Sequence, residues 1–208
     1  AEMNYANQTY DTAAFYFARV ADLSPNQFAE RSNLLAARLY YFNIKNFELA
    51  EKYYLKLKDA YRTASEGLLD GGVDALLIET TQDLLQAKAA INGAREAIDK
   101  SERDIVLIAQ VTVEATGTML LGSEIGAALN ALEPLDIDII GLNCATGPAE
   151  MSEHLRYLSK NARVAISVMP NAGLPILGPD GASYPLSPDE LASALNTFVD
   201  DYGLSLIG

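Results

Sequence analysis

Short apolar runs rich in Ile and Val alternate with helical patterns from Asp59 to the end of the 208-residue chain. Near-continuous apolar strands separated by helices are typical of a parallel sheet covered on both faces. The pattern therefore predicts an α/β fold, either a (β/α) barrel or an open sheet. We expect strands over 75–79, 105–113, 137–143, 164–169 and 204–207, and helices over 82–99, 122–132, 148–160 and 188–202.

Two of these helices have clear start signals. Ser187-Pro188-Asp189-Glu190 places a Ser cap before Pro at the first helical position and Glu at the third. This arrangement forms a capping box, in which the cap side chain and the glutamate satisfy each other's backbone N–H groups. Gly147-Pro148 with Glu150 predicts the start of the helix after Cys144, and Thr80 with Asp83 predicts a weaker capping box.

Residues 1–58 have a different composition from residues 59–208. The first segment has a net charge of +1 and no glycine, and it holds twelve of the seventeen Phe and Tyr residues; the second has a net charge of −14. Such a contrast predicts two structural units, with 1–58 all helical and 59–208 α/β.

The helical segment shows an internal repeat. Tyr10, Ala13 and Phe17 align with Phe47, Ala50 and Tyr54 at a period of 37 residues, and the helical stripe of the first repeat continues through Leu35, Leu39 and Phe42. Ser24-Pro25-Asn26-Gln27 predicts a helix start, with helices on both sides of a break near residue 24, and Pro25 is taken to end the first repeat. Residues 1–58 thus resemble a tetratricopeptide (TPR) helical repeat, over one and a half repeats. An aromatic stripe at this spacing is equally typical of a helical core, and a repeat array needs about three units to be stable alone.

Polar residues gather where the predicted strands end. Glu79 and Thr80 follow the first strand, Thr112 and Glu114 the second, Asn143 and Cys144 the third, and Asn171 the fourth. Because the carboxyl ends of parallel strands meet at one edge, we expect these side chains to converge. Cys144 is the only cysteine, so the chain forms no internal disulfide. A free thiol is a reactive group or simply a small buried hydrophobe, and its strand-end position favours the first interpretation.

Three long motifs resemble a known family. Gly67-Leu68-Leu69-Asp70-Gly71-Gly72-Val73-Asp74-Ala75-Leu76-Leu77-Ile78-Glu79-Thr80, Gly141-Leu142-Asn143-Cys144-Ala145-Thr146-Gly147-Pro148 and Met169-Pro170-Asn171-Ala172-Gly173-Leu174-Pro175 are similar to the zinc homocysteine S-methyltransferases, in the form of the homocysteine-binding domain of cobalamin-dependent methionine synthases. The resemblance covers about 150 residues, 59–208, and not residues 1–58.

The resemblance implies a (β/α)₈ barrel with a zinc ion at its carboxyl face, held by three cysteine thiolates and by the sulfur of the substrate homocysteine. It makes Cys144 the first zinc ligand, places Glu79 to meet the substrate ammonium group, and gives Asn143 and Asn171 a part in shaping the substrate pocket. No catalytic residue is assigned. The methyl donor would come from cobalamin and folate modules, which are not in this chain.

The chain departs from the family pattern in two ways. The family's other two zinc cysteines, an adjacent pair after the last strand, do not occur, and neither do the early barrel strands with their Asp-Gly loop. One thiolate is a poor zinc site, because stable centres take three or four protein ligands. His154, predicted in mid-helix, is expected at the surface. We therefore expect a methionine synthase fragment that by itself neither binds zinc tightly nor methylates homocysteine.

Five strands cannot close an eight-stranded barrel, so the strands near residues 75 and 204 are expected to be edges that can pair with another chain. The alternative functions are a TPR-type scaffold that binds a protein partner, and an artificial fusion without catalysis. The TPR-like helices or another chain would cover the open barrel.

The net charge of −13 disfavours a nucleic-acid partner, because phosphate binding needs clustered Lys and Arg. No apolar run approaches the roughly 20 residues that span a bilayer, and the first residues do not resemble an export signal. We expect no membrane contact and a cytoplasmic location.

Overall fold

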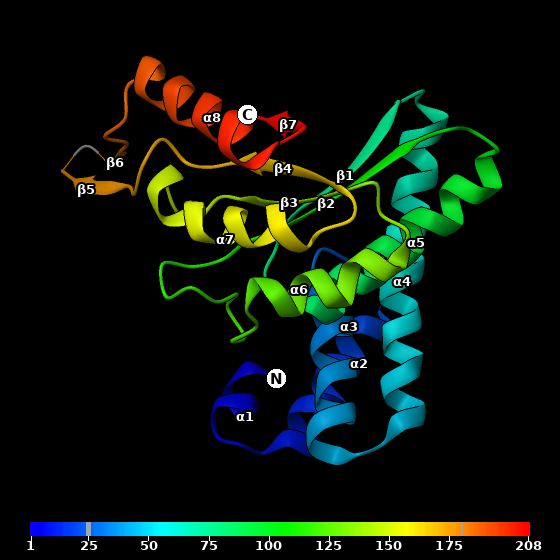
Figure 1. Cartoon of the computed structure of the whole chain (residues 1–208). Coiled ribbons are helices and arrows are strands. Elements are labelled where there is room, and N and C mark those ends of the chain that lie inside the picture. The colour runs from blue at the N-terminus through cyan, green and yellow to red at the C-terminus, as the bar shows by residue number, and fades with distance from the viewer. Residues whose placement is uncertain (24–25, 180) are drawn as a thin grey trace.

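The computed structural model describes residues 1–23, 26–179 and 181–208 (Figure 1). Its centre is a parallel sheet in the order β1-β2-β3-β4-β7, which confirms the predicted α/β class. The helices between the strands also lie close to their predicted positions. The strands are β1 (Ala75–Thr81), β2 (Val106–Val111), β3 (Ile139–Asn143), β4 (Ala165–Met169) and β7 (Leu206–Ile207), and the connecting helices are α5 (Leu84–Ser101), α6 (Ile125–Leu132) with the short η2 (Glu133–Leu135), α7 (Pro148–Asn161) and α8 (Pro188–Tyr202).

The connecting helices cover one face of the sheet, so the expectation of cover on both faces is wrong for the described residues. The main hydrophobic core takes alternate strand residues, such as Ala109, Ile140 and Ile166, and packs them against these helices. On the opposite face, Leu77 and Val106 each remain 40% exposed. The physical reason is the strand order, because right-handed crossovers between strands that follow one another in sequence place every helix on the same side.

The sheet has two open edges, as predicted. β1 pairs only with β2, and β7 pairs only with β4, among the described strands. A separate antiparallel hairpin, β5 (Ile176–Gly178) with β6 (Gly181–Ser183), lies between β4 and α8 and was not predicted. It forms part of the long connection between β4 and α8 and, among the described residues, does not pair with the main sheet (Figure 1).

The chain begins with helices that have a hydrophobic core of their own. Ala13, Ala14 and Phe17 are buried there, which confirms the first predicted stripe. Phe42 and Phe47 are exposed instead. Phe42 lies in a π-helix, whose wider turn changes the direction of its side chains, and Phe47 is the first residue of the next helix. These helices are α1 (Glu2–Ala6), α2 (Tyr10–Asp22), α3 (Ala29–Arg38), the π-helix η1 (Leu39–Ile44) and α4 (Phe47–Asp70).

The predicted division after residue 58 falls inside α4, a continuous helix of 24 residues. The second half of α4 packs along α5, and Gly93 of α5 lies against the Lys58 carbonyl oxygen. The division into two units and the TPR assignment both stay predictions. The predicted helix start at Ser24-Pro25 lies outside the described residues. No helix within the described ranges is both long and apolar enough to cross a membrane.

Candidate functional site

A buried asparagine organises the end of the sheet. Asn143 is the last residue of β3 and is 2% exposed. Its Oδ1 accepts hydrogen bonds from the backbone N–H of Thr80 at 3.0 Å and from the hydroxyl of Thr112 at 3.4 Å. Its Nδ2 donates to Thr80 Oγ1 at 2.7 Å. One side chain therefore joins the carboxyl ends of β1, β2 and β3.

Cys144 follows directly and lies within this network. The thiol is half-buried, and its Sγ is 3.5 Å from Asn143 Nδ2 and 3.8 Å from Thr80 Oγ1. Its backbone N–H donates to the Met169 carbonyl at 3.1 Å, which ties the cysteine to the end of β4. The predicted convergence of strand ends is thus realised for Cys144, Asn143 and Thr80.

The backbone around the thiol is strained. Thr80, Cys144 and Ala145 have φ angles of +55°, +58° and +57°. The left-handed region costs non-glycine residues about 1–2 kcal/mol each and is least favourable for β-branched side chains such as threonine. A shift of the pairing register between Ile78 and Thr81 marks the same place on β1. Strain of this kind gathers at functional sites, where the surrounding structure holds it in place.

The other two predicted residues, Asn171 and Glu79, differ in burial and in their neighbours. Asn171 is half-buried, and its backbone N–H donates to the Thr146 carbonyl at 3.0 Å, which joins the loops after β3 and β4. Glu79 is exposed and lines a pocket beside Tyr61 and Gln86 at the open edge of β1. No hydrogen bond joins the Glu79 side chain to Cys144 in the described part of the chain.

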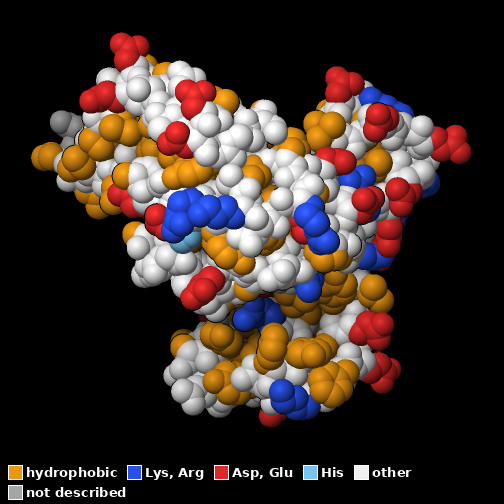
Figure 2. All heavy atoms as spheres, viewed as in Figure 1, with side chains coloured by type: hydrophobic (Ala, Val, Ile, Leu, Met, Phe, Trp, Pro, Cys, Tyr) orange, Lys and Arg blue, Asp and Glu red, His pale blue; other side chains and the backbone are white. Residues whose placement is uncertain are grey.

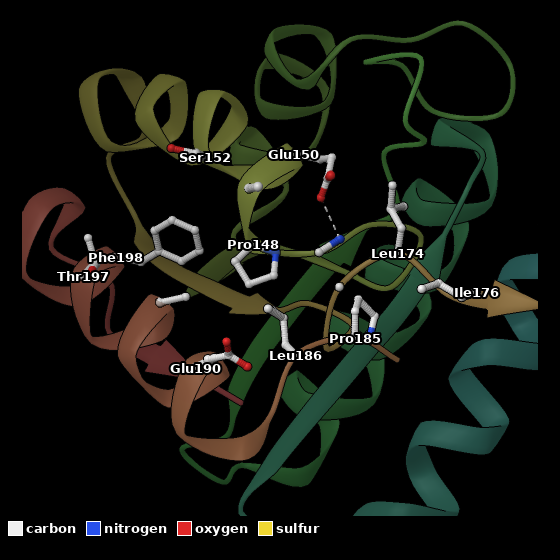
Figure 3. Close-up of a pocket in the computed structure, with 14 residues that line it drawn as sticks. Pro148, Glu150, Ser152, Leu174, Ile176, Pro185, Leu186, Glu190, Thr197 and Phe198 are labelled. Atoms are coloured by element: carbon white, nitrogen blue, oxygen red, sulfur yellow. Dashed lines mark hydrogen bonds between the residues drawn. The ribbon is translucent and has the colours of Figure 1, made fainter. Parts of the chain in front are cut away.

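A larger pocket of about 680 Å³ lies between α7, α8 and the connection after β4 (Figure 3). Figure 3 shows Pro148, Leu186 and Phe198 around it, with the carboxylates of Glu150 and Glu190 at its rim. This pocket was not predicted from the sequence. The available signal was the long connection between the fourth strand and the last helix, since loops of that length are uncommon unless they carry function.

Glycines let the pocket wall and the cysteine loop approach closely. A Cβ atom at Gly147 would lie 2.7 Å from Gly173 Cα, and one at Gly173 would lie 2.6 Å from Pro185 Cγ. Such distances exclude any larger residue without movement of the backbone or the proline ring. The loops after β3 and β4 are therefore in direct contact, and the pocket is adjacent to the loop that carries Cys144.

The two carboxylates at the pocket rim cap helices. Glu150 accepts from the Gly147 N–H at 3.1 Å, and Glu190 accepts from the Ser187 N–H at 2.8 Å and from its hydroxyl at 2.7 Å. The hydrogen bonds from Ser187 lower the pKa of Glu190 below its ordinary value. The capping box predicted at Ser187 is confirmed, because Ser187 Oγ also accepts from the Glu190 N–H at 3.3 Å, and the helix start predicted at Gly147-Pro148 is confirmed as the start of α7.

The described residues alone do not fit a metal ion. Within them, no three His, Cys, Asp or Glu side chains come together closely enough to hold one. His154 is half-buried in the middle of α7, and burial lowers the pKa of its imidazole below the usual 6.5. Cys144 offers one sulfur ligand, with an amide and a hydroxyl beside it.

A sequence model of the family described as homocysteine S-methyltransferase matches residues 28–208. The chain belongs to the homocysteine S-methyltransferase family. The match begins at residue 28, so the expectation that the resemblance excludes residues 1–58 is wrong for residues 28–58. The matched residues include the whole parallel sheet and Cys144 at the end of β3.

Two curated relatives are methionine synthases, from Mycobacterium tuberculosis (strain ATCC 25618 / H37Rv) and Mycobacterium leprae (strain TN). Each is 64% identical to the chain over 160 residues, which are 77% of this chain and 13% of the relative. The chain thus spans a small part of the proteins it matches. The activity, substrates and partners of the whole relatives are therefore only proposed for this chain.

Solved structures of the homocysteine methyltransferase MmuM from Escherichia coli share the fold. The metallated form aligns with a TM-score of 0.54 and 17% identity, over 86% of this chain and 64% of that one. The apo form aligns with a TM-score of 0.53 and 18% identity, over 89% and 71%. At this identity the likeness concerns the fold alone, and it supports the barrel-like α/β class.

Proposed function

We propose that the chain is part of the homocysteine-binding domain of a methionine synthase, with homocysteine as the substrate and Cys144 as one ligand of a zinc site. Two observations support this proposal: the 64% identity to methionine synthases, and the strained, hydrogen-bonded turn that presents the only thiol at the end of the sheet. Glu79 would meet the substrate ammonium group, and Asn143 and Asn171 would shape the pocket. Cobalamin and folate would act through other domains, in the cytoplasm.

The observation that carries the proposal is the direction of β7. The Gly208 N–H donates to the Val168 carbonyl at 3.1 Å, while the Cys144 N–H donates to the next carbonyl of β4, that of Met169. Residues directly after Gly208 would therefore emerge at the same end of the sheet as Cys144, two strands away from β3. With strand spacings of about 4.8 Å, they would begin roughly 10 Å from the cysteine backbone. Ligands placed there could complete a site that Cys144 begins.

Zinc retention tests this arrangement. The 208-residue chain and a version extended after Gly208 by an adjacent Cys-Cys pair would be loaded with zinc, dialysed and measured by elemental analysis. We expect about one zinc per chain in the extended protein and much less in the 208-residue chain, because stable centres need three or four ligands. Cys144→Ser in the extended protein should abolish retention.

Two results would contradict the proposal. Equimolar zinc in the 208-residue chain would show that one thiolate suffices or that other residues bind the metal. Zinc retained by the extended Cys144→Ser protein would show that Cys144 is not a ligand. Thr63→Val, on the exposed face of α4, is the matched control and should leave retention unchanged.

A protein-interaction function is the second candidate, and one surface favours it. A groove of about 780 Å³ between η1, α4 and α5 is lined by Tyr41, Phe42 and Phe47, each at least half exposed. Exposed aromatic clusters are typical of protein-binding sites. Calorimetry with homocysteine plus zinc, set against a peptide-binding screen, separates this candidate from the proposed one.

A further inference from the structure

The orientation of the Asn143 amide follows from its neighbours. The backbone N–H of Thr80 can only donate a hydrogen bond, so the Asn143 atom facing it at 3.0 Å is the carbonyl oxygen Oδ1. The amide nitrogen Nδ2 then faces Thr80 Oγ1 at 2.7 Å and Cys144 Sγ at 3.5 Å. Thr80 thus decides which end of the amide meets the sulfur.

The direction of the Thr80 hydroxyl bond follows in the same way. Oγ1 accepts a hydrogen from Asn143 Nδ2, which leaves the single hydroxyl hydrogen of Thr80 for another acceptor. Cys144 Sγ lies 3.8 Å away, within the longer range of hydrogen bonds to sulfur. A thiolate can only accept, so in that form the sulfur would receive one hydrogen bond from Thr80 and one from Asn143.

We propose that Thr80 is a positioning residue for Cys144, because its backbone N–H orients the Asn143 amide and its hydroxyl donates the second hydrogen bond to the sulfur. The inference rests on the proposed function only for the role of the sulfur as a zinc ligand; the hydrogen bonds themselves do not depend on it. The left-handed backbone of Thr80, with φ of +55°, supports the assignment. It is unfavourable for a β-branched residue, yet it is the conformation in which this N–H and this hydroxyl meet the same asparagine.

The test compares Thr80→Val with Thr80→Ser in the 208-residue chain. Valine keeps the branched shape without the hydroxyl, and serine keeps the hydroxyl. Because Cys144 is the only cysteine, the Raman spectrum has one S–H stretching band, whose frequency responds to hydrogen bonding. We expect Thr80→Val to shift this band and Thr80→Ser to leave it near the wild-type position.

Nuclear magnetic resonance gives a second readout on Asn143. Loss of the Thr80 hydroxyl leaves an Nδ2 hydrogen without its acceptor, so its exchange with water should become about five-fold faster, the factor expected for one ordinary hydrogen bond. Thr80→Ser should restore slow exchange. Thr112→Val removes a donor to Oδ1 without touching the sulfur, and it should leave the S–H band in place.

The outcomes separate this inference from the proposed function. An unchanged S–H band and unchanged Asn143 exchange in a folded Thr80→Val protein would overturn the positioning role, whatever the zinc experiment shows. A shifted band that serine restores would support it, even if the extended chain retained no zinc. If Thr80→Val does not fold, Thr80→Ala provides the same loss of the hydroxyl with a smaller side chain.

Discussion

Gly93 is the position at which the packing of α4 on α5 is most sensitive to one methyl group. A Cβ atom there would lie 2.5 Å from the Lys58 carbonyl oxygen and 2.8 Å from the Arg62 backbone nitrogen. Both neighbours are backbone atoms of α4, so no side-chain rotation can relieve the contact. Gly93→Ala therefore forces the two helices apart.

Two other helical glycines make a matched series. Nothing lies within 4 Å of a Cβ atom at Gly67 in α4, while one at Gly126 in α6 would meet the hydroxyl end of Tyr157 at 2.9 Å. All three substitutions gain the helix propensity of alanine over glycine, worth up to about 1 kcal/mol. The series therefore compares the free-energy cost of an added methyl group in open space (Gly67), against a movable tyrosine ring (Gly126) and against rigid backbone (Gly93).

The expected magnitudes follow from these contacts. Overpacking costs typically about 1–3 kcal/mol, and rigid backbone neighbours place Gly93→Ala at the upper end, for a net loss of about 2 kcal/mol after the propensity gain. Gly67→Ala should gain up to about 1 kcal/mol. Gly126→Ala should fall near zero, because Tyr157 is 40% exposed and can move outward.

Urea unfolding measures these differences by circular dichroism and by tyrosine fluorescence. For a chain of this length, a loss of 2 kcal/mol lowers Tm by about 4–8 °C. If Gly93→Ala and Gly67→Ala agreed within about 0.5 kcal/mol, the close approach of α4 and α5 would be refuted. Fluorescence reports mainly on the tyrosine-rich helices before residue 58, so separate midpoints for the two probes would show that the helices unfold independently of the sheet.

Two further predictions concern charge and capping. The backbone and side chain of Arg163 hold the pKa of Glu133 below its ordinary 4.5. This carboxylate therefore contributes stability above pH 4.5, and that stability is lost as pH falls through its folded pKa. Glu133→Gln should therefore flatten the acid limb of a curve of unfolding free energy against pH. An unchanged acid limb would exclude the effect. Ser187→Ala removes the α8 cap and should cost about 1 kcal/mol in urea unfolding, whereas Ser187→Thr should cost little, and equal losses would argue against the cap.

The strands and connecting helices could be predicted because apolar runs and capping residues are local signals. The face of the sheet that the helices cover could not be predicted, since a run such as Val106–Val111 is apolar at nearly every position and so has no distinct polar face. Gln110 and Ser167 offered a partial signal. They are polar residues inside predicted strands, and they meet on the face away from the helices, where Gln110 Nε2 donates to Ser167 Oγ at 3.1 Å. Their contact needs Gly141 between them, because a Cβ atom there would lie 2.0 Å from Ser167 Oγ.

The meeting of polar strand ends could be predicted from the sequence, but its geometry could not, and the site roles of these residues stay predictions. Residue types at strand ends indicated Asn143 and Cys144, and the structure joins them to Thr80. The left-handed backbone at Thr80 and Cys144 has no sequence signal, because it is the conformation that these residue types rarely adopt. Contacts across the sheet impose it, and such contacts appear only when the strands are in place.

The composition changes at residue 58 inside the continuous helix α4, and not at a linker between two units. α4 packs against both α3 and α5, and Tyr53 in its first half belongs to the hydrophobic core of the first helices. Charged pairs join α4 to α5 on both sides of the contact, with Lys58 on Glu96 at 2.5 Å and Lys100 on Glu66 at 3.0 Å. A helix of 24 residues is about 36 Å long and transmits displacement along its axis. Because α4 is continuous across residue 58 and is joined to α5 by these contacts, the two segments should unfold together unless the contact at Gly93 is broken.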